Sequence, residues 1–298
     1  MTKQMISELQ VIGIRYHDSQ PAADDERALD AYEQSGVYGR AGIPYTIVEP
    51  RLPEAQRVAE ETDNLGLLGG EVANAIAAAR QAGKAILMTG GNCCHISGIF
   101  GGLQDAHGPE LKVGLVWFDA HGDFNTPHTT LSGMLGGMPV AVCAGLAYPR
   151  WREMSHIVSP LPTDRIVMVD VRNLDTAEET LIRATDVTIA RVADGFTGDV
   201  DLQTAVTHLA HKCDLIYLHI DSDILDERYV PNHGTKEPNG PDMEQVQTAV
   251  DIALSTGKVG VLALVSVYGA GEGSKISATS AIELMGFSLE SWYKHGMR

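Results

Sequence analysis

The sequence lacks several features that mark other classes of protein. It has 22 lysines and arginines against 39 aspartates and glutamates, and its formal net charge of −17 argues against nucleic acids and anionic membranes as partners. Its 4 cysteines show no CxxC spacing, so neither a zinc ribbon nor a disulfide scaffold is indicated. No apolar run reaches about 18 residues and residues 1–10 contain no signal core, so the cytoplasm is the expected location.

The chain also has no internal repeat, and no proline- or serine-rich linker divides it. Its 298 residues are 44% hydrophobic and 20% charged, which is typical of a globular protein with an ample core. A chain of this length can form one large α/β domain or two ordinary ones. Because no boundary is visible, we interpret residues 1–298 as a single domain.

Unbroken apolar runs alternate with amphipathic segments along the chain. Apolar runs bounded by turn residues are typical of strands buried on both faces, as in a parallel sheet between two helical layers. Such runs occupy residues 11–17, 85–92, 112–123, 165–173, 186–192, 215–223 and 259–269. Helical spacing occurs at residues 65–84, 201–213, 243–258 and 277–295. The sequence therefore predicts an α/β fold.

The segment WFDAHGDFNTP (117–127) ends one of these runs with three possible metal ligands. Asp119, His121 and Asp123 occupy alternate positions, and in an extended backbone such side chains point to one side. Carboxylates held close together raise one another's pKa unless a cation lies among them. An acidic pair after a strand is also found in helix caps and solvated loops, so this motif alone does not establish a metal site.

Two further polar segments, GGNCCH (90–95) and DSDILD (221–226), also follow apolar runs. The carboxyl ends of parallel strands form the ligand crevice of an open sheet, so the three segments are expected to meet there. Together they supply seven candidate ligands: Cys93 or Cys94, His95, Asp119, His121, Asp123, Asp221 and Asp223. This set exceeds the needs of one tetrahedral ion and predicts two divalent ions that share a water and prepare it for attack.

Three features resemble the ureohydrolase family of arginase, agmatinase and their relatives. They are the segment WFDAHGDFNTP, the segment DSDILD with Pro231 and GT at 234–235 after it, and GG at 90–91. The resemblance implies a three-layer α/β/α sandwich with a mainly parallel eight-stranded sheet. It also implies a dinuclear manganese centre that acts on a small-molecule substrate, in a homo-oligomer that is a trimer or a hexamer.

The resemblance also implies roles for individual residues. Asp119 and Asp221 would bridge the two metals, and Asp123 would bind one of them and orient the nucleophile. His121 and Asp223 would bind the other metal. Asn125, Ser132 and Asp175 match positions that hold the amino-acid end of the substrate in arginases.

The first departure from the family pattern concerns a metal ligand. The family has a histidine ligand in GGDHS, and the aligned residue here is Cys93 in GGNCCH. Either Cys93 is the ligand, or a longer loop places His95 there. The cysteine resembles the branch that contains the hydroxyarginine hydrolase of D-cycloserine biosynthesis, which favours Cys93. A thiolate is a soft ligand, so zinc or iron could replace manganese.

Two other departures concern the substrate. Gly136 stands where arginases carry a proton-shuttling histidine, and the region of their guanidinium-binding glutamate offers only Val265 and Ser266, with Glu272 in a nearby loop. We therefore expect a hydrolase of a non-peptide C–N bond in an amidine or a modified guanidine, such as a hydroxyguanidine, rather than in arginine itself.

Two alternatives remain open from the sequence. In the first, the same fold and metals act on a neutral linear or aromatic amide, for which Phe124 and Tyr268 offer aromatic surface. In the second, the protein is a non-catalytic binding protein that metal ions stabilise.

Overall fold

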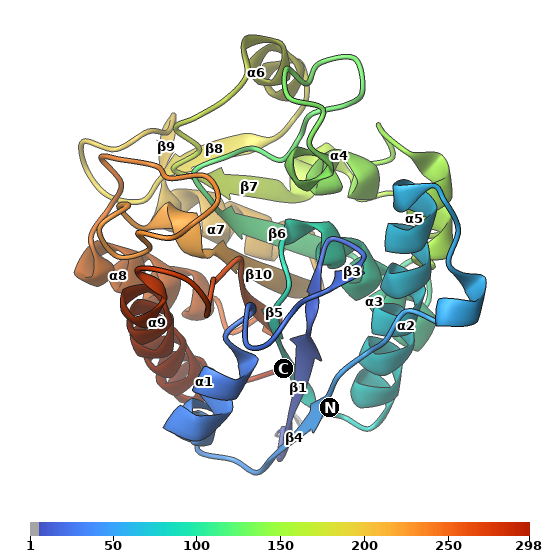
Figure 1. Ribbon diagram of the computed structural model, residues 1–298. Coiled ribbons are helices and arrows are strands. Elements are labelled where there is room, and N and C mark those ends of the chain that lie inside the picture. Colours follow the sequence, from blue (N-terminus) through green and yellow to red (C-terminus); the bar gives the residue numbers. More distant parts are fainter. Residues whose placement is uncertain (1–5) are drawn as a thin grey trace.

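The computed structural model describes residues 6–298, which form a parallel sheet enclosed by helices (Figure 1). The sheet has nine strands in the order β4-β1-β5-β11-β10-β6-β7-β8-β9, and all of its pairings are parallel. The strands are β1 (Leu9–Ile14), β4 (Tyr45–Val48), β5 (Ala85–Gly90), β6 (Val113–Phe118), β7 (Ile166–Val169), β8 (Thr188–Arg191), β9 (Val200–Asp201), β10 (Leu215–Asp221) and β11 (Val259–Val265). The expected fold class is confirmed, and the two-residue β9 at one edge takes the count past the eight strands expected.

Helices cover both faces of this sheet. Their bounds are α1 (Leu29–Ser35), α2 (Glu61–Gln81), α3 (Ile96–His107), α4 (Pro139–Cys143), α5 (Pro149–Met154), α6 (Thr176–Arg183), α7 (Leu202–Lys212), α8 (Met243–Leu254) and α9 (Ser274–His295). The residues of α2 to α5 pack into one core cluster, and those of α1 and α7 to α9 into another. Figure 1 shows the two helical groups on opposite sides of the strands, which is the predicted α/β/α sandwich.

Alternate residues of each central strand enter opposite cores. In β6, Leu115 and Trp117 join the core under α2 to α5, while Val116 and Phe118 join the other. Both sets are fully buried, which explains why these strands are unbroken apolar runs rather than alternating ones. No helix within residues 6–298 is both long and apolar enough to span a membrane.

Glycines allow α3 to lie unusually close to its neighbours. A Cβ atom on Gly101 would lie 1.7 Å from the backbone oxygen of Ser155, and one on Gly98 would lie 2.6 Å from the backbone oxygen of Gly69 in α2. No side chain fits at such distances. The close packing anchors the start of α3, which directly follows the GGNCCH segment.

A small antiparallel ribbon, β2 (Tyr16–His17) and β3 (Gln20–Pro21), lies beyond the end of β1. Its turn contains Asp18 with a φ of 50°, in the left-handed region that aspartate tolerates better than most residues. His95 approaches the backbone oxygen of Asp18 through its Nε2 atom, at 2.9 Å. The ribbon is thereby tied to the loop that follows β5.

Candidate metal centre

The three polar segments meet at the carboxyl edge of the sheet, as predicted. Asp221 is the last residue of β10, Asp119 directly follows β6, and a 3-10 turn, Cys93–His95, follows β5. Gly90 and Gly91 make the sharp exit from β5 with φ values of 71° and 58°. A Cβ atom on Gly91 would lie 2.7 Å from the His95 ring, so a larger residue there would displace the turn.

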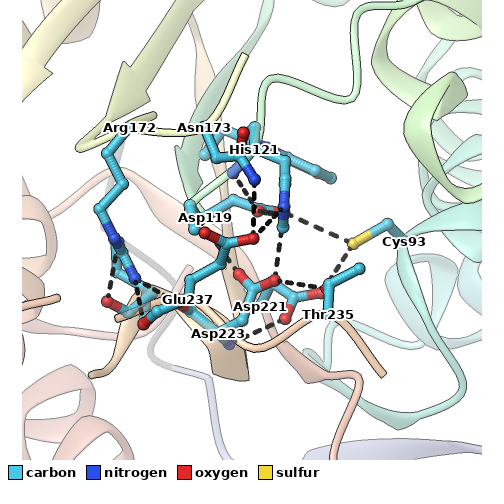
Figure 2. Close-up of polar contacts among 12 residues, drawn as sticks. Cys93, Asp119, His121, Arg172, Asn173, Asp221, Asp223, Thr235 and Glu237 are labelled. Carbon is cyan, nitrogen blue, oxygen red and sulfur yellow. Dashed lines mark hydrogen bonds and ion pairs between the residues drawn. The ribbon is translucent and has the colours of Figure 1, made fainter. Parts of the chain in front are cut away.

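The acidic side chains of these segments converge. Figure 2 shows Asp119, Asp221 and Asp223 pointing toward one another, with His121 and Cys93 beside them. Ligand atoms lie within 4.8 Å of one another in three groups: Cys93, Asp119 and Asp123; Asp119, His121 and Asp223; and Asp221, Asp223 and His233. Asp119, Asp221 and Asp223 are each less than 5% exposed. Buried carboxylates this close are costly unless they are paired with cations.

Backbone amides hold the carboxylates in place. Asp119 Oδ1 accepts a hydrogen bond from the amide of His121 at 2.6 Å, and Asp221 Oδ1 accepts one from the amide of Asp223 at 3.0 Å. The amide of Ala120 donates to Asp223 Oδ1 at 3.2 Å and so links the two motifs. Asp123 has a φ of 46°, which turns the chain back after the DAHGD segment.

His121 lies between the carboxylates and a supporting glutamate. Its Nδ1 atom is 3.3 Å from Asp119 Oδ1 and 3.1 Å from Asp223 Oδ2, while its Nε2 atom is 3.0 Å from Glu237 Oε1. Asn173 donates to the same Glu237 oxygen at 2.8 Å. A carboxylate behind a histidine orients the ring of a metal ligand and raises its basicity. The sequence offered no signal for Glu237, which lies in an irregular loop.

The pKa shifts of the centre follow from buried carboxylates that lie close to one another. Burial and neighbouring carboxylates raise the pKa values of Asp119 and Asp123 well above the usual carboxyl range. Burial would lower the pKa of His121, but its carboxylate partners raise it far above the ordinary histidine value. Burial would likewise raise the pKa of Asp223, yet His121 lowers it. Oxygen and imidazole donors in this state suit divalent cations, so the residues fit the predicted metals.

His233 is a further member of the centre. Its Nδ1 atom is 2.6 Å from the backbone oxygen of Thr235, and its buried Nε2 atom lies 3.4 Å from Asp221 Oδ1 without forming a hydrogen bond. Burial works against the charged ring, but Asp221 and Asp223 raise the pKa of His233 to about 9. An unsatisfied nitrogen facing the carboxylates is consistent with a cation between them. His128, which also lies near a motif in the sequence, does not join this cluster.

Cys93, and not His95, faces the carboxylates. Cys93 Sγ lies 3.0 Å from Asp221 Oδ2 and 3.7 Å from Asp119 Oδ2. The His95 nitrogens contact the backbone oxygens of Asn92 and Asp18, at 3.0 Å and 2.9 Å. The geometry supports Cys93 as the ligand, which stays a prediction until the metals are measured.

A cavity of about 460 Å³ opens over the centre. The three residues expected to hold the substrate, Asn125, Ser132 and Asp175, all line it, and Asn125 Nδ2 donates to Asp175 Oδ2 at 3.2 Å. Gly136 and Ser266 line it as well. The exposed Glu272 does not, so it does not replace the missing glutamate.

Solved structures of arginases have a similar fold. The arginase of Bacillus cereus superposes with a TM-score of 0.81 at 23% identity, covering 95% of this chain and 98% of that one. This protein therefore shares the fold of that arginase, and its own acidic centre lies at the carboxyl edge of the sheet.

Sequence comparison gives the family. The profile of the arginase family matches residues 47–288, so the chain belongs to the arginase family. The arginase of Entamoeba histolytica is 30% identical over 209 residues, covering 67% of this chain and 68% of that protein. The arginase of Bacillus caldovelox is 26% identical over 240 residues, covering 80% and 77%. The protein is therefore a metal-dependent hydrolase of C–N bonds other than peptide bonds.

Proposed function

We propose that this protein hydrolyses an amidine or a modified guanidine, such as a hydroxyguanidine, in a small molecule, and that arginine is a poor substrate. The observation that carries the proposal is the composition of the cavity over the acidic centre. A Cβ atom on Gly136 would meet no heavy atom within 4 Å, so open space stands where arginases place a histidine. Ser266, which directly follows β11, supplies a hydroxyl in place of a carboxylate.

The proposed metals are two divalent ions, with manganese first and zinc or iron as substitutes. Cys93 and Asp123 would hold one ion, and His121 and Asp223 the other, with Asp119 and Asp221 between them. When bound, such a pair lowers the pKa of a shared water to near neutrality and stabilises the negative charge that develops on attack.

Asp123 is the residue that we propose orients the nucleophile. It is 6% exposed and lines the cavity, so one carboxylate oxygen can accept a hydrogen bond from a water there. Glu178 stabilises the following loop, because its carboxylate accepts hydrogen bonds from the amides of Phe124 and Asp175 at 2.9 Å and 3.3 Å. That loop carries Asn125, which we expect to bind the end of the substrate remote from the reacting carbon.

A carboxylate in the wall of the cavity favours a cationic substrate. Asp18 lines the cavity from the β2–β3 turn, and its Oδ1 atom accepts a hydrogen bond from Asn92 at 2.7 Å. Its Oδ2 atom has no hydrogen-bond partner within residues 6–298. A carboxylate oxygen left free in this way can accept a charge-assisted hydrogen bond from an amidinium, worth about 1.5–3 kcal/mol.

The neutral-amide alternative has less support in the structure. Tyr268 lines the cavity and offers an aromatic edge, but Phe124 is fully buried in the core and does not line it. Membership of a family of hydrolases weighs against a non-catalytic binding protein. We further propose a homo-oligomer, a trimer or a hexamer as in the relatives that the motifs resemble, which sedimentation would test.

The direct test is a substrate panel on manganese-loaded protein. It would contain arginine, Nω-hydroxyarginine, simple amidines and neutral amides, with urea, hydroxyurea and ammonia as the measured products. We expect release from hydroxyguanidine or amidine members, little from arginine, and none after chelation. Hydrolysis of neutral amides alone, or activity that survives complete metal removal, would contradict the proposal.

A matched pair of variants tests the cationic subsite. Asp18→Asn should raise the KM of a cationic substrate about 10-fold or more with kcat largely kept, because a charge-assisted hydrogen bond is lost. Asp24→Asn is the control, since Asp24 lies in the same segment with a similar φ of 47° but is exposed and does not line the cavity. Equal effects of the two substitutions would remove Asp18 from the site.

A further inference from the structure

Two buried residues of β10 lie behind Cys93, on the side away from the cavity. His219 is fully buried and stacks on Trp117, with ring centroids 3.9 Å apart and planes 5° from parallel. Its Nε2 atom lies 3.4 Å from Cys93 Sγ, and its Nδ1 atom lies 2.5 Å from the hydroxyl of Tyr217. Tyr217 is fully buried as well. The three side chains form a continuous line from the core to the metal centre.

The direction of each hydrogen bond in this line follows from counting protons. The hydroxyl of Tyr217 has one proton to donate, and within residues 6–298 its only partner is His219 Nδ1. Because a buried hydroxyl donor is costly to leave unpaired, Tyr217 donates and Nδ1 accepts. Nδ1 therefore carries no proton, and the ring holds its proton on Nε2. Among the residues that the structure describes, the only partner of that proton is the sulfur of Cys93.

We propose that Tyr217 and His219 are positioning residues that direct a hydrogen bond onto Cys93 Sγ and thereby adapt a soft thiolate to a centre built from hard carboxylates. This inference rests on the proposed function, because it takes Cys93 as a metal ligand. The thiol of Cys93 lies 3.0 Å from Asp221 Oδ2 and donates its own proton there. That proton must leave when a cation is bound. The hydrogen bond from His219 does not depend on the thiol proton, because the sulfur is the acceptor in that bond.

A hydrogen bond to a thiolate has two consequences for the metal. It withdraws electron density from sulfur, so the ligand becomes harder and discriminates less strongly against manganese in favour of zinc. It also holds the sulfur in one direction, because the stacked ring of His219 cannot turn without leaving Trp117. A thiolate without this hydrogen bond would be softer, and the metal would compete less well with a proton for its sulfur. The relay of hydrogen bonds from Tyr217 through His219 to Cys93 is thus expected to influence both metal affinity and metal choice.

The test replaces the donor while keeping the packing. His219→Phe retains a ring against Trp117 but has no proton to give, whereas His219→Gln retains an N–H near the place of Nε2. The probe is cobalt(II), whose thiolate complexes absorb in the near ultraviolet by sulfur-to-metal charge transfer. For His219→Phe we expect this band at longer wavelength and cobalt affinity lower by about 10- to 100-fold. His219→Gln should restore both in large part.

Manganese and zinc affinities, measured by competition, give a second readout. The ratio of zinc to manganese affinity should rise in His219→Phe and in Tyr217→Phe, with the smaller change in the latter. Tyr217→Phe also serves if His219→Phe fails to fold, because it removes the proton donor that sets the tautomer. Cys94→Ser is the matched control, since Cys94 Sγ contacts Asp18 and not the carboxylates of the centre, and should leave the band unchanged.

The outcomes separate this inference from the proposed function. A wild-type protein that binds cobalt without a thiolate band would remove Cys93 from the centre and refute both the proposed role of Cys93 as a ligand and the relay that depends on it. A wild-type band that neither His219→Phe nor Tyr217→Phe shifts, at unchanged affinity, would refute the relay alone and leave the metal centre intact.

Discussion

Removing the metal ions should reverse the sign with which stability depends on pH. Oxygen atoms lie within 4.8 Å of each other in three carboxylate pairs, Asp119 with Asp123, Asp119 with Asp223, and Asp221 with Asp223. At a separation of 4.8 Å and an effective dielectric constant of about 20, two unit charges repel by about 3.5 kcal/mol. The metal-free fold can relieve this repulsion only by retaining protons, which raises the pKa values of Asp119 and Asp123.

The sign follows from comparing the folded and unfolded chains. Above the ordinary carboxyl pKa the unfolded chain has lost these protons while the folded metal-free protein still holds them, so stability falls as pH rises through the raised pKa values of Asp119 and Asp123. His121 and His233, whose pKa values are also raised, act in the same direction above the ordinary histidine range. Asp223, with its lowered pKa, loses its stabilising effect only in stronger acid.

The metal-loaded protein should behave in the opposite way. Its ligands must be deprotonated to bind, so loading is more complete and stability rises as pH rises. One site with free metal at about 100 times its Kd adds about 2.7 kcal/mol to the free energy of unfolding. At roughly 2–4 °C per kcal/mol for a large domain, this is a Tm difference of roughly 5–10 °C near neutral pH.

Differential scanning calorimetry between about pH 5 and pH 8, with manganese or with chelator, would measure this difference. The two forms share every other titrating group, so the comparison cancels the background of the acidic chain. Asp119→Asn should flatten the slope of the metal-free form, because it removes one charge from two of the close pairs. Parallel pH profiles for the loaded and metal-free proteins would refute the reasoning.

Three further predictions test the site and its packing. Cys93→Ala should remove one metal ion per subunit in elemental analysis while His95→Ala removes none, and the reverse ranking would overturn the assignment. Gly136→His should change the free energy of unfolding by no more than about 0.5 kcal/mol, because a Cβ there meets no heavy atom within 4 Å, and should raise turnover of substrates with basic leaving groups. Unchanged turnover would mean that a histidine there is not what limits the rate. Gly101→Ala should lower stability in denaturant titration by about 1–3 kcal/mol or more, because its Cβ would lie 1.7 Å from the backbone oxygen of Ser155, and a wild-type midpoint would contradict that packing.

The central strands could be predicted from sequence because they are buried on both faces. An apolar run such as the one containing β10 is typical of a strand that helices cover on both sides. The edge strand β4 was not predicted, because its sequence YTIV is only four residues long, includes the polar Thr46 and is exposed throughout, unlike the longer runs of the buried strands. The short β9 escaped prediction as well, since two residues carry no periodicity.

Which residue of the GGNCCH segment faces the carboxylates of the centre was decided by tertiary structure. Consecutive residues of the 3-10 turn Cys93–His95 point in different directions, so a shift of the turn by one or two residues would bring another side chain to the carboxylates. The close packing of α3 and the exit geometry at Gly90 and Gly91 set that direction. Contacts between distant loops could not be seen in the sequence either: Glu237 reaches His121 from a loop that no pattern marks.

The sequence by itself determined the fold class and the acidic centre, because alternating ligands after apolar runs can meet only where parallel strands end. Tertiary structure alone decided how the centre is supported and what its cavity offers to a substrate. Those properties depend on loops and turns from distant parts of the chain, such as the β2–β3 turn with Asp18. Their mutual placement is set by packing and not by local spacing.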